Sequence, residues 1–308
     1  MCIRPGLHWG ARKPYRGTGQ LPKLHHRHAG RVPAVSQSLT ATSQRQRALP
    51  IELISALGAS FLGFFTTIGS ISALSLRCLA AMARRPLDLH ALLRQLYAVG
   101  VQSLSIAFLT ALFTGAVMAL QFGWGLERFG AANYVGKVIS VGFVMELGPV
   151  LTALLVGGRV GAGITAELGS MKVAEQIDAI RALGADPIRE LVVPRVLACI
   201  IAMPLLAAMA DLVGIFGGMV IAVTEQGLST AYYLDQVLTT VDVPKVLHGL
   251  IKAGFFGYFF GIIGCHMGLS TEGGTEGVGR FTTRAVVLTS ITILIGDFIL
   301  GKILLPFT

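Results

Sequence analysis

Long apolar stretches alternate with short polar segments along most of the chain. An α-helix needs roughly 20 apolar residues to cross the hydrocarbon core of a bilayer. Five stretches reach that length, and they cover residues 96–124, 135–158, 191–224, 246–269 and 285–305. The pattern therefore predicts an all-α integral membrane protein with five transmembrane helices.

A sixth apolar stretch, residues 53–76, differs from the other five. It lacks charge, but Ser, Thr and Gly interrupt its apolar residues, and Arg77, Arg84 and Arg85 follow it. A helix of this kind can span the bilayer or lie along its interface. Periodicity alone leaves both alternatives open.

The distribution of basic residues orients the five clearer spans. Cytoplasmic loops of membrane proteins carry an excess of Lys and Arg. Four arginines, the last of them Arg94, precede the first span, and Arg280 and Arg284 lie in the loop before the last span. We therefore expect these two segments, and the charged segment after the second span, to be cytoplasmic, and the loop near 225–245 to lie outside.

One charged segment interrupts the apolar pattern in the middle of the chain. Residues 174–195, AEQIDAIRALGADPIRELVVPR, carry four acidic and three basic side chains. Val173, Ile177 and Ile180 recur at helical spacing, which predicts one helix over residues 165–183 with these three side chains on one face.

Turn signals then predict an elbow and a second helix. Gly184 is a typical stop signal, and Asp186 followed by Pro187 is a typical start, with the aspartate as N-cap and the proline in the first turn. The resulting helix–elbow–helix is either a solvated loop at the membrane surface or a docking surface for a cytoplasmic partner.

The composition supports a membrane protein and locates the net charge. The chain is 53% hydrophobic and 13% charged, whereas soluble domains carry about 25% charged residues. Residues 1–50 hold nine Lys or Arg and no acid, and residues 51–308 hold sixteen residues of each sign. The net charge of +9 therefore belongs to a tail and does not indicate a nucleic-acid-binding surface.

We expect residues 1–50 to be a disordered basic extension, because they contain too few large apolar groups to offset the ordering entropy. An Arg- and Ser-rich segment without acids resembles an organelle transit peptide. A plain cytoplasmic tail or a misplaced start codon is the simpler explanation and the one we favour. Residues 51–308 form the predicted membrane domain.

No motif for catalysis, metal binding or nucleotide binding stands out. The four cysteines are scattered without a CxxC pair, and HExxH and GxSxG motifs are absent from the sequence. The segment GDFILGKI, residues 296–303, resembles a P-loop but has Ile303 where Ser or Thr must reach magnesium. We expect no cofactor, no metal and no enzyme activity in this chain.

Four ionisable residues fall within or near the predicted spans, namely Glu146, Arg159, Asp211 and Asp297. An unpaired charge in the hydrocarbon costs several kcal/mol, so such residues are functional candidates unless they pair with one another or bind a proton. Glu146 also precedes Gly148-Pro149, where the missing proline N–H favours a kink. A carboxylate on a kinked helix beside a cavity suits an amphiphilic ligand.

Several of these segments together resemble a known family. MELGPVLTALLVGGRVGAGITAELGSMKVAEQIDAIRALGADPIRELVVPRVLA (145–198) is similar to the signature region of the MlaE/YrbE family, the permease subunits of ABC-type lipid transporters that work with MCE-domain proteins. RQLYAVGVQSL (94–104), RFTTRAVV (280–287) and GDF (296–298) extend the similarity, which runs from about residue 51 to the C-terminus.

The resemblance implies an architecture. An interfacial helix over residues 51–83 precedes the five spans, and two copies of the chain form a homodimer. The segment 165–190 between the second and third spans is the coupling helix that docks in a cleft of a cytoplasmic ATPase. We expect this contact to involve Glu175, Asp178, Arg181, Asp186 and Pro187.

The resemblance also implies a function. Glu146 and Gln121 line a lipid-binding pocket between the two protomers, and an MCE-domain ring stands on the outer face. The expected activity is ATP-driven movement of phospholipid, or a similar amphiphile, between the bacterial inner membrane and the MCE-domain partner. An organelle envelope is the alternative location if residues 1–50 are a transit peptide.

Two rival functions come from other classes. An ion-coupled secondary transporter would use Glu146, Asp211 and Asp297 as a proton relay, and its transport would follow the proton gradient. An integral membrane enzyme would need a nucleophile or a metal cluster, and the sequence shows neither.

Overall fold

The structure, a computed structural model, describes residue 63 and residues 65–83 and 88–307. Within these ranges the chain is helical apart from turns and short connections, and no strand occurs in them. The predicted extension 1–50 and the first part of the predicted interfacial helix lie outside the described residues.

Six described helices are long and apolar enough to cross a membrane. They cover Phe65–Met82, Leu89–Glu127, Ala132–Val173, Ile188–Thr224, Val243–Leu269 and Gly274–Phe307. The prediction of an all-α, multi-pass membrane protein is therefore confirmed. The helix Phe65–Met82 meets the same length and hydropathy criteria as the others, so its interfacial placement stays a prediction.

Two of the long helices contain breaks where the sequence is unusual. The first runs as α2 (Leu89–Val99), a 3-10 turn (Val101–Ser103) and α3 (Leu104–Glu127). The second runs as α4 (Val135–Gly142), a π-helical turn (Phe143–Leu147) and α5 (Gly148–Val173). The π turn adjoins Gly148-Pro149, so the irregularity predicted from the missing proline N–H is present.

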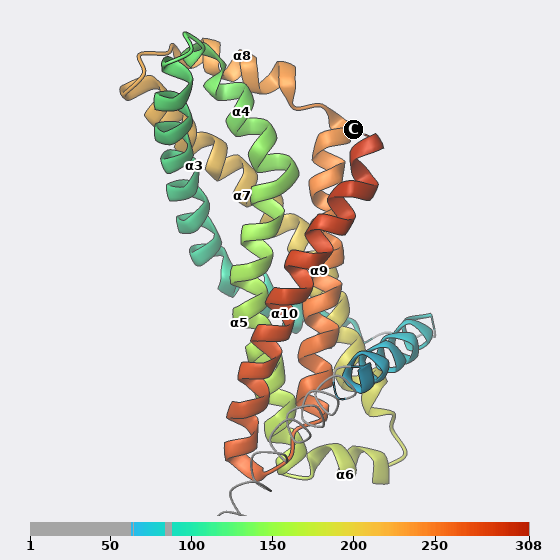
Figure 1. The fold of residues 1–308 in the computed structure, drawn as a ribbon. Helices are drawn as coiled ribbons and strands as arrows, with labels where there is room; N and C mark the ends of the chain where they lie inside the picture. Colours follow the sequence, from blue (N-terminus) through green and yellow to red (C-terminus); the bar gives the residue numbers. More distant parts are fainter. Residues whose placement is uncertain (1–62, 64, 84–87, 308) are drawn as a thin grey trace, which may run out of the picture. The chain divides into compact units, whose positions relative to one another are not determined.

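The remaining helices complete the bundle. A second π turn (Ile188–Val192) leads into α7 (Val193–Thr224), followed by α8 (Thr230–Thr240), α9 (Val243–Leu269) and α10 (Gly274–Leu304). Helix α5 packs on α9 and α10, while α3 packs mainly on α7. The short α6 (Gln176–Ala182) and α8 lie at opposite ends of these helices (Figure 1).

Close glycine contacts explain how several helices approach one another. A side chain at Gly115 on α3 would overlap the backbone of Gly214 on α7, and one at Gly257 on α9 would overlap the carbonyl of Cys199. A Cβ at Gly264 would lie 3.0 Å from the carbonyl oxygen of Gly161. Small residues therefore let these backbones touch, as is common between helices in lipid.

The contact between α3 and α7 yields a stability prediction. We expect Gly115→Leu to reduce sharply the yield of folded, monodisperse protein in detergent, because the new side chain must push two helices apart. Size-exclusion profiles and thermal unfolding measure this. Gly125→Leu on the same helix is the matched control, since nothing lies within 4 Å of a Cβ at that position. Equal behaviour of the two variants would contradict the observed packing.

The predicted single helix over residues 165–183 is wrong. Helix α5 continues from the second span to Val173, and α6 begins only at Gln176. Glu175 between them adopts a left-handed conformation with φ +58°, which redirects the chain. Val173 therefore belongs to α5 and is exposed, while Ile177 on α6 is fully buried, so the two do not share the predicted face.

The predicted elbow is confirmed at both of its signals. Gly184 has φ +81° and its N–H bonds to the carbonyl oxygen of Arg181, which ends α6. An Asp186 carboxylate oxygen accepts a hydrogen bond from the N–H of Ile188 at 3.0 Å, which caps the next helical segment. That segment runs without interruption into α7, so the elbow joins two spans directly.

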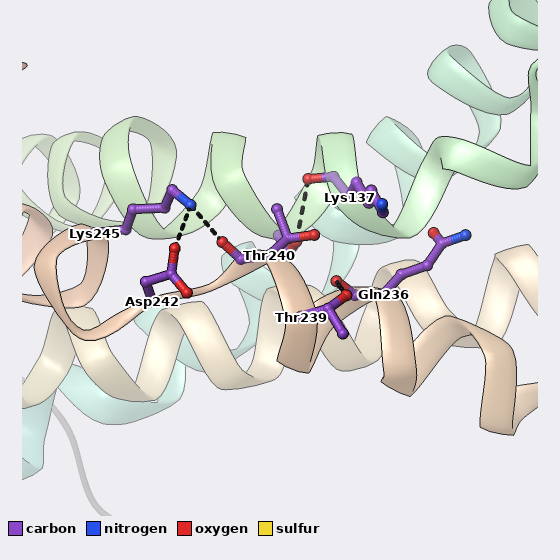
Figure 2. A network of polar contacts seen from close by, with 7 residues as sticks. Lys137, Gln236, Thr239, Thr240, Asp242 and Lys245 are labelled. Carbon is purple, nitrogen blue, oxygen red and sulfur yellow. Dashed lines mark hydrogen bonds and ion pairs between the residues drawn. The ribbon is translucent and has the colours of Figure 1, made fainter.

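Polar contacts hold α8 and the start of α9 at the other end. Lys245 donates to the carbonyl oxygen of Thr240 at 2.6 Å and pairs with Asp242 at 3.0 Å (Figure 2). Gln236 is buried and its amide donates to the carbonyl of Asn133. Burial also raises the pKa of the Tyr233 hydroxyl well above its ordinary range, which keeps this group a hydrogen-bond donor.

Candidate functional site

Three charged side chains from different helical segments meet inside the bundle. The side chain of Lys252 on α9 is fully buried, and its Nζ lies 2.6 Å from Glu146 Oε2 and 2.5 Å from Asp297 Oδ1. Glu146 comes from the π turn before α5, and Asp297 comes from α10. We call Glu146, Lys252 and Asp297 the charged cluster.

The backbone break beside Glu146 helps to hold Lys252. Pro149 has no N–H, so carbonyl groups in the preceding turn lose a donor. The Lys252 Nζ lies 3.3 Å from the carbonyl oxygen of Met145, which is one of these groups. The ammonium donates to the Met145 carbonyl and to the Glu146 carboxylate, and it forms an ion pair with Asp297.

The charged cluster is open on the Glu146 side. The Glu146 side chain is 48% exposed, whereas that of Asp297 is 24% exposed. A Cβ at Gly301 on α10 would lie 3.5 Å from the second Glu146 oxygen, so this glycine leaves room for the carboxylate. Two carboxylates share one ammonium, which leaves an accessible acceptor at Glu146 that can contact a polar or cationic group.

Two further buried polar residues lie near the charged cluster. His248 is one helical turn before Lys252, is 2% exposed, and has no hydrogen-bond partner for either ring nitrogen among the described residues. Asp211 on α7 packs against Gly148, where a side chain would overlap its carboxylate, and its Oδ1 has no partner within the described ranges. Asp211 forms no ion pair there, so the structure does not join it to the charged cluster.

The two residues expected to bind lipid lie on different helical segments. Glu146 lies in the charged cluster, whereas Gln121 is an exposed residue of α3. Among the described residues of the single chain, no hydrogen bond or ion pair connects them. A shared pocket between two protomers therefore stays a prediction.

Sequence reasoning missed the residue at the centre of the cluster. It identified Glu146, Arg159, Asp211 and Asp297 as ionisable residues that need partners, and within the described residues all but Asp211 have them. Lys252 pairs with both carboxylates, and the Arg159 guanidinium donates to the carbonyl oxygen of Gln102 at 2.6 Å. A single lysine within the apolar stretch 246–269 was the available signal.

The residues expected to couple to an ATPase lie on and beside α6. Asp178 pairs with Arg181 at 2.8 Å and with Lys172 at 3.5 Å, and Asp178 and Arg181 are both more than half exposed. Glu175 and Asp186 are exposed, whereas Pro187 is buried. Pro187 therefore lies where it can position the next helix and not where a partner can touch it.

The elbow also exposes an apolar residue that the sequence analysis did not single out. Leu183, just before Gly184, is 87% exposed. By contrast, Ile177 on α6 is fully buried. The segment thus exposes the Asp178–Arg181 ion pair and the apolar side chain of Leu183, while the side chain of Ile177 is buried.

Comparisons with known proteins agree on one family. The family described as Permease MlaE matches residues 92–303. A probable ABC transporter permease protein of Rickettsia felis is 40% identical over 253 residues, which cover 82% of this chain and 98% of that protein. The intermembrane phospholipid transport system permease protein MlaE of Haemophilus influenzae is 34% identical over 255 residues, which cover 82% of this chain and 98% of that protein.

A plant protein is also similar. TRIGALACTOSYLDIACYLGLYCEROL 1, chloroplastic, of Arabidopsis thaliana is 38% identical over 210 residues, which cover 68% of this chain and 60% of that protein. Bacterial and chloroplast proteins thus share this membrane domain.

Proposed function

The chain belongs to the MlaE permease family, and from this premise we propose that it is the membrane subunit of an ATP-driven ABC transporter. The proposed transporter moves phospholipid, or a similar amphiphile, between the inner membrane and an MCE-domain partner. The names of the bacterial relatives, an ABC transporter permease and an intermembrane phospholipid permease, support this activity.

The geometry of α6 is the observation that carries the ATPase part of the proposal. The helix is anchored through Ile177, exposes the Asp178–Arg181 pair, and presents Leu183 to the surroundings. It also joins two spans, α5 and α7, without a flexible linker. Movement of a protein docked on this segment would therefore pass directly to both helices.

The charged cluster is the proposed point of contact with lipid. Lys252 fixes Glu146 beside the break in the second span, and half of the Glu146 side chain stays exposed. In the proposed homodimer, Glu146 and Gln121 of the two protomers line one pocket between them. The amphiphile would place its polar part near Glu146 and its acyl chains along the apolar helices.

The remaining partners follow from the family. An MCE-domain protein would stand at the end of the bundle that carries α8, and the ATPase would dock at the end that carries α6. The proposed location is the bacterial inner membrane, with an organelle envelope as the alternative because one relative is named chloroplastic.

An ion-coupled secondary transporter remains the competing function. That transporter would use Glu146, Asp211 and Asp297 as its proton relay. Glu146 and Asp297 are both paired with Lys252, and Asp211 lies outside the charged cluster, so the arrangement favours the ABC proposal. A relay would need carboxylates that exchange protons with one another.

The proposed division of labour can be tested with purified proteins. We expect the chain alone to hydrolyse no ATP above background, and its co-expressed ATPase to copurify with it and hydrolyse ATP. Lipid movement in proteoliposomes should then require ATP and survive a protonophore. Turnover by the chain after removal of every other protein, or transport that follows the proton gradient without ATP, would refute the proposal. Mass spectrometry of the copurified lipids would identify the amphiphile.

A further inference from the structure

A second polar site lies between α2 and α5, away from the charged cluster. A cavity of about 160 Å³ is lined by Gln95 and Gln102 on one side and by Arg159, Gly163 and Glu167 on the other. Arg159 lies thirteen residues beyond Glu146, which corresponds to roughly 20 Å along the helix axis. The cavity is therefore separate from the site proposed for the transported lipid.

The cavity is lined by one basic residue, Arg159, and one acidic residue, Glu167, and Arg159 forms no ion pair among the described residues. One Arg159 nitrogen donates to the Gln102 carbonyl at 2.6 Å and to the Ser103 hydroxyl at 3.1 Å. Its other N–H groups have no partner within residues 88–307, and the ion pairs described there do not include Arg159. Glu167 is paired with Arg195 at 3.1 Å and contributes no net charge with it.

Side-chain amides surround this guanidinium. Gln95 and Gln102 both line the cavity, and neither side chain makes a hydrogen bond within the described part of the chain. Gly163 faces open space, because nothing lies within 4 Å of a Cβ at that position. The site thus combines a cation, unused amide donors and room for a ligand.

The cavity lies about one hydrocarbon thickness from the start of α9. Gly264 on α9 lies against Gly161 on α5, with a separation of 3.0 Å between its ideal Cβ and the Gly161 carbonyl oxygen. Helix α9 begins at Val243 at the far end, so Gly264 is roughly 30 Å along the helix. That distance equals the thickness of the hydrocarbon core. With the start of α9 at one edge of the hydrocarbon core, Arg159, half a turn from Gly161, would lie near the other edge, on the α6 side.

We propose that this cavity binds the phosphate group of a membrane phospholipid from the leaflet on the α6 side. The guanidinium of Arg159 would hold the phosphate, as arginine commonly does, and the amides of Gln95 and Gln102 would complete its hydrogen bonds. Val160 and Ile164 border the cavity and suit the start of the acyl chains. A free phosphate ion would gain nothing from this apolar border.

The inferred site requires that the chain spans a membrane, and it does not depend on ATP-driven transport. A lipid bound there would rest against the junction of α2 and α3, which Arg159 also holds. It would therefore fix the position of α2 relative to α5, the helix that leads to α6.

Two variants of the full chain test the site. Native mass spectrometry of the purified protein would be titrated with phosphatidylglycerol, with a diacylglycerol of the same acyl chains, and with inorganic phosphate. We expect Arg159→Gln to weaken binding of one phosphatidylglycerol about tenfold, because a hydrogen-bonded charge is removed. Gly163→Leu should remove the same bound lipid by filling the cavity, while the Arg159 contacts to the α2–α3 junction stay intact.

The controls separate this site from other lipid contacts. Gly279→Leu on α10 introduces the same side chain at another glycine with open space around it, and it should bind lipid like the unmodified chain. Diacylglycerol should bind at least about tenfold more weakly than phosphatidylglycerol. Unchanged phosphatidylglycerol binding in both Arg159→Gln and Gly163→Leu would overturn the inference. Inorganic phosphate that competes as well as the lipid would overturn the assignment to a phospholipid.

Discussion

Lys252→Met is expected to abolish lipid transport and to destabilise the folded protein. The substitution keeps the length of the side chain but leaves Glu146 and Asp297 without their shared ammonium. Breaking a buried ion pair by removing one partner typically costs about 3–5 kcal/mol, because the remaining charge is uncompensated. The Met145 carbonyl also loses a donor. Thermal unfolding in detergent and lipid transport in proteoliposomes measure the two effects.

A lysine on the same helix provides the matched control. Lys245 also pairs with an aspartate, but Asp242 is 63% exposed at the end of the bundle (Figure 2). Exposed pairs contribute about 0–1 kcal/mol, so Lys245→Met should change stability only slightly. A similar loss of stability in Lys252→Met and Lys245→Met would show that the burial of Lys252 does not make its ion pairs more important than an exposed pair.

Neutralising the carboxylates separates stability from function. The triple variant Lys252→Met, Glu146→Gln, Asp297→Asn removes all three charges while it keeps the side-chain shapes nearly constant. We expect much of the stability to return, because no uncompensated charge remains, whereas transport should stay low without the Glu146 carboxylate. Full transport in the triple variant would mean that the cluster only supports the fold.

Reversal of the α6 ion pair is expected to uncouple the chain from its ATPase. Asp178→Arg with Arg181→Asp keeps helix propensity nearly unchanged and allows the same one-turn pair to form. The new arginine would lie near Lys172, which pairs with Asp178 at 3.5 Å, but the side chain at position 178 is 51% exposed, so solvent screens much of the repulsion. A surface matched to a protein groove should not tolerate the reversal, since like charges across a partly desolvated contact cost on the order of several kcal/mol.

The expected phenotype is specific. The double variant should reach the membrane at normal levels but lose copurification with the ATPase, or keep it while hydrolysis no longer drives lipid movement. The matched control is Asp242→Lys with Lys245→Asp, which reverses another ion pair of the same spacing at the opposite end of the bundle. Normal ATPase binding and normal transport in the α6 variant would make the segment a solvated surface loop.

Much of the fold was predictable because helices in lipid must satisfy their own backbone hydrogen bonds. Long apolar stretches therefore had to be helices, and all five predicted spans lie within described helices. Local signals were equally reliable at the elbow, where Gly184 needs its left-handed conformation and Asp186 caps the next turn. The break beside Pro149 followed from a missing N–H. These features depend on residues close together in the sequence.

Other features depend on contacts between distant residues. The periodicity of Val173, Ile177 and Ile180 predicted one helix, but packing of the end of α5 and the left-handed Glu175 divide it in two. The sequence showed that Glu146 and Asp297 needed partners, yet it could not show that one lysine serves both.

The sequence by itself thus determined the membrane-spanning helices, the break beside Pro149, the elbow at Gly184 and the family to which the chain belongs, since apolar length and local backbone chemistry depend on neighbouring residues. Only the tertiary structure decided that Glu146, Lys252 and Asp297 form one cluster and that Arg159 faces a cavity beside α2. Glu146 and Lys252, which are 106 positions apart, meet because glycine contacts set the spacing and rotation of the helices. Helical periodicity fixes which side chains share a face, but the packing of one helix on another fixes which faces meet.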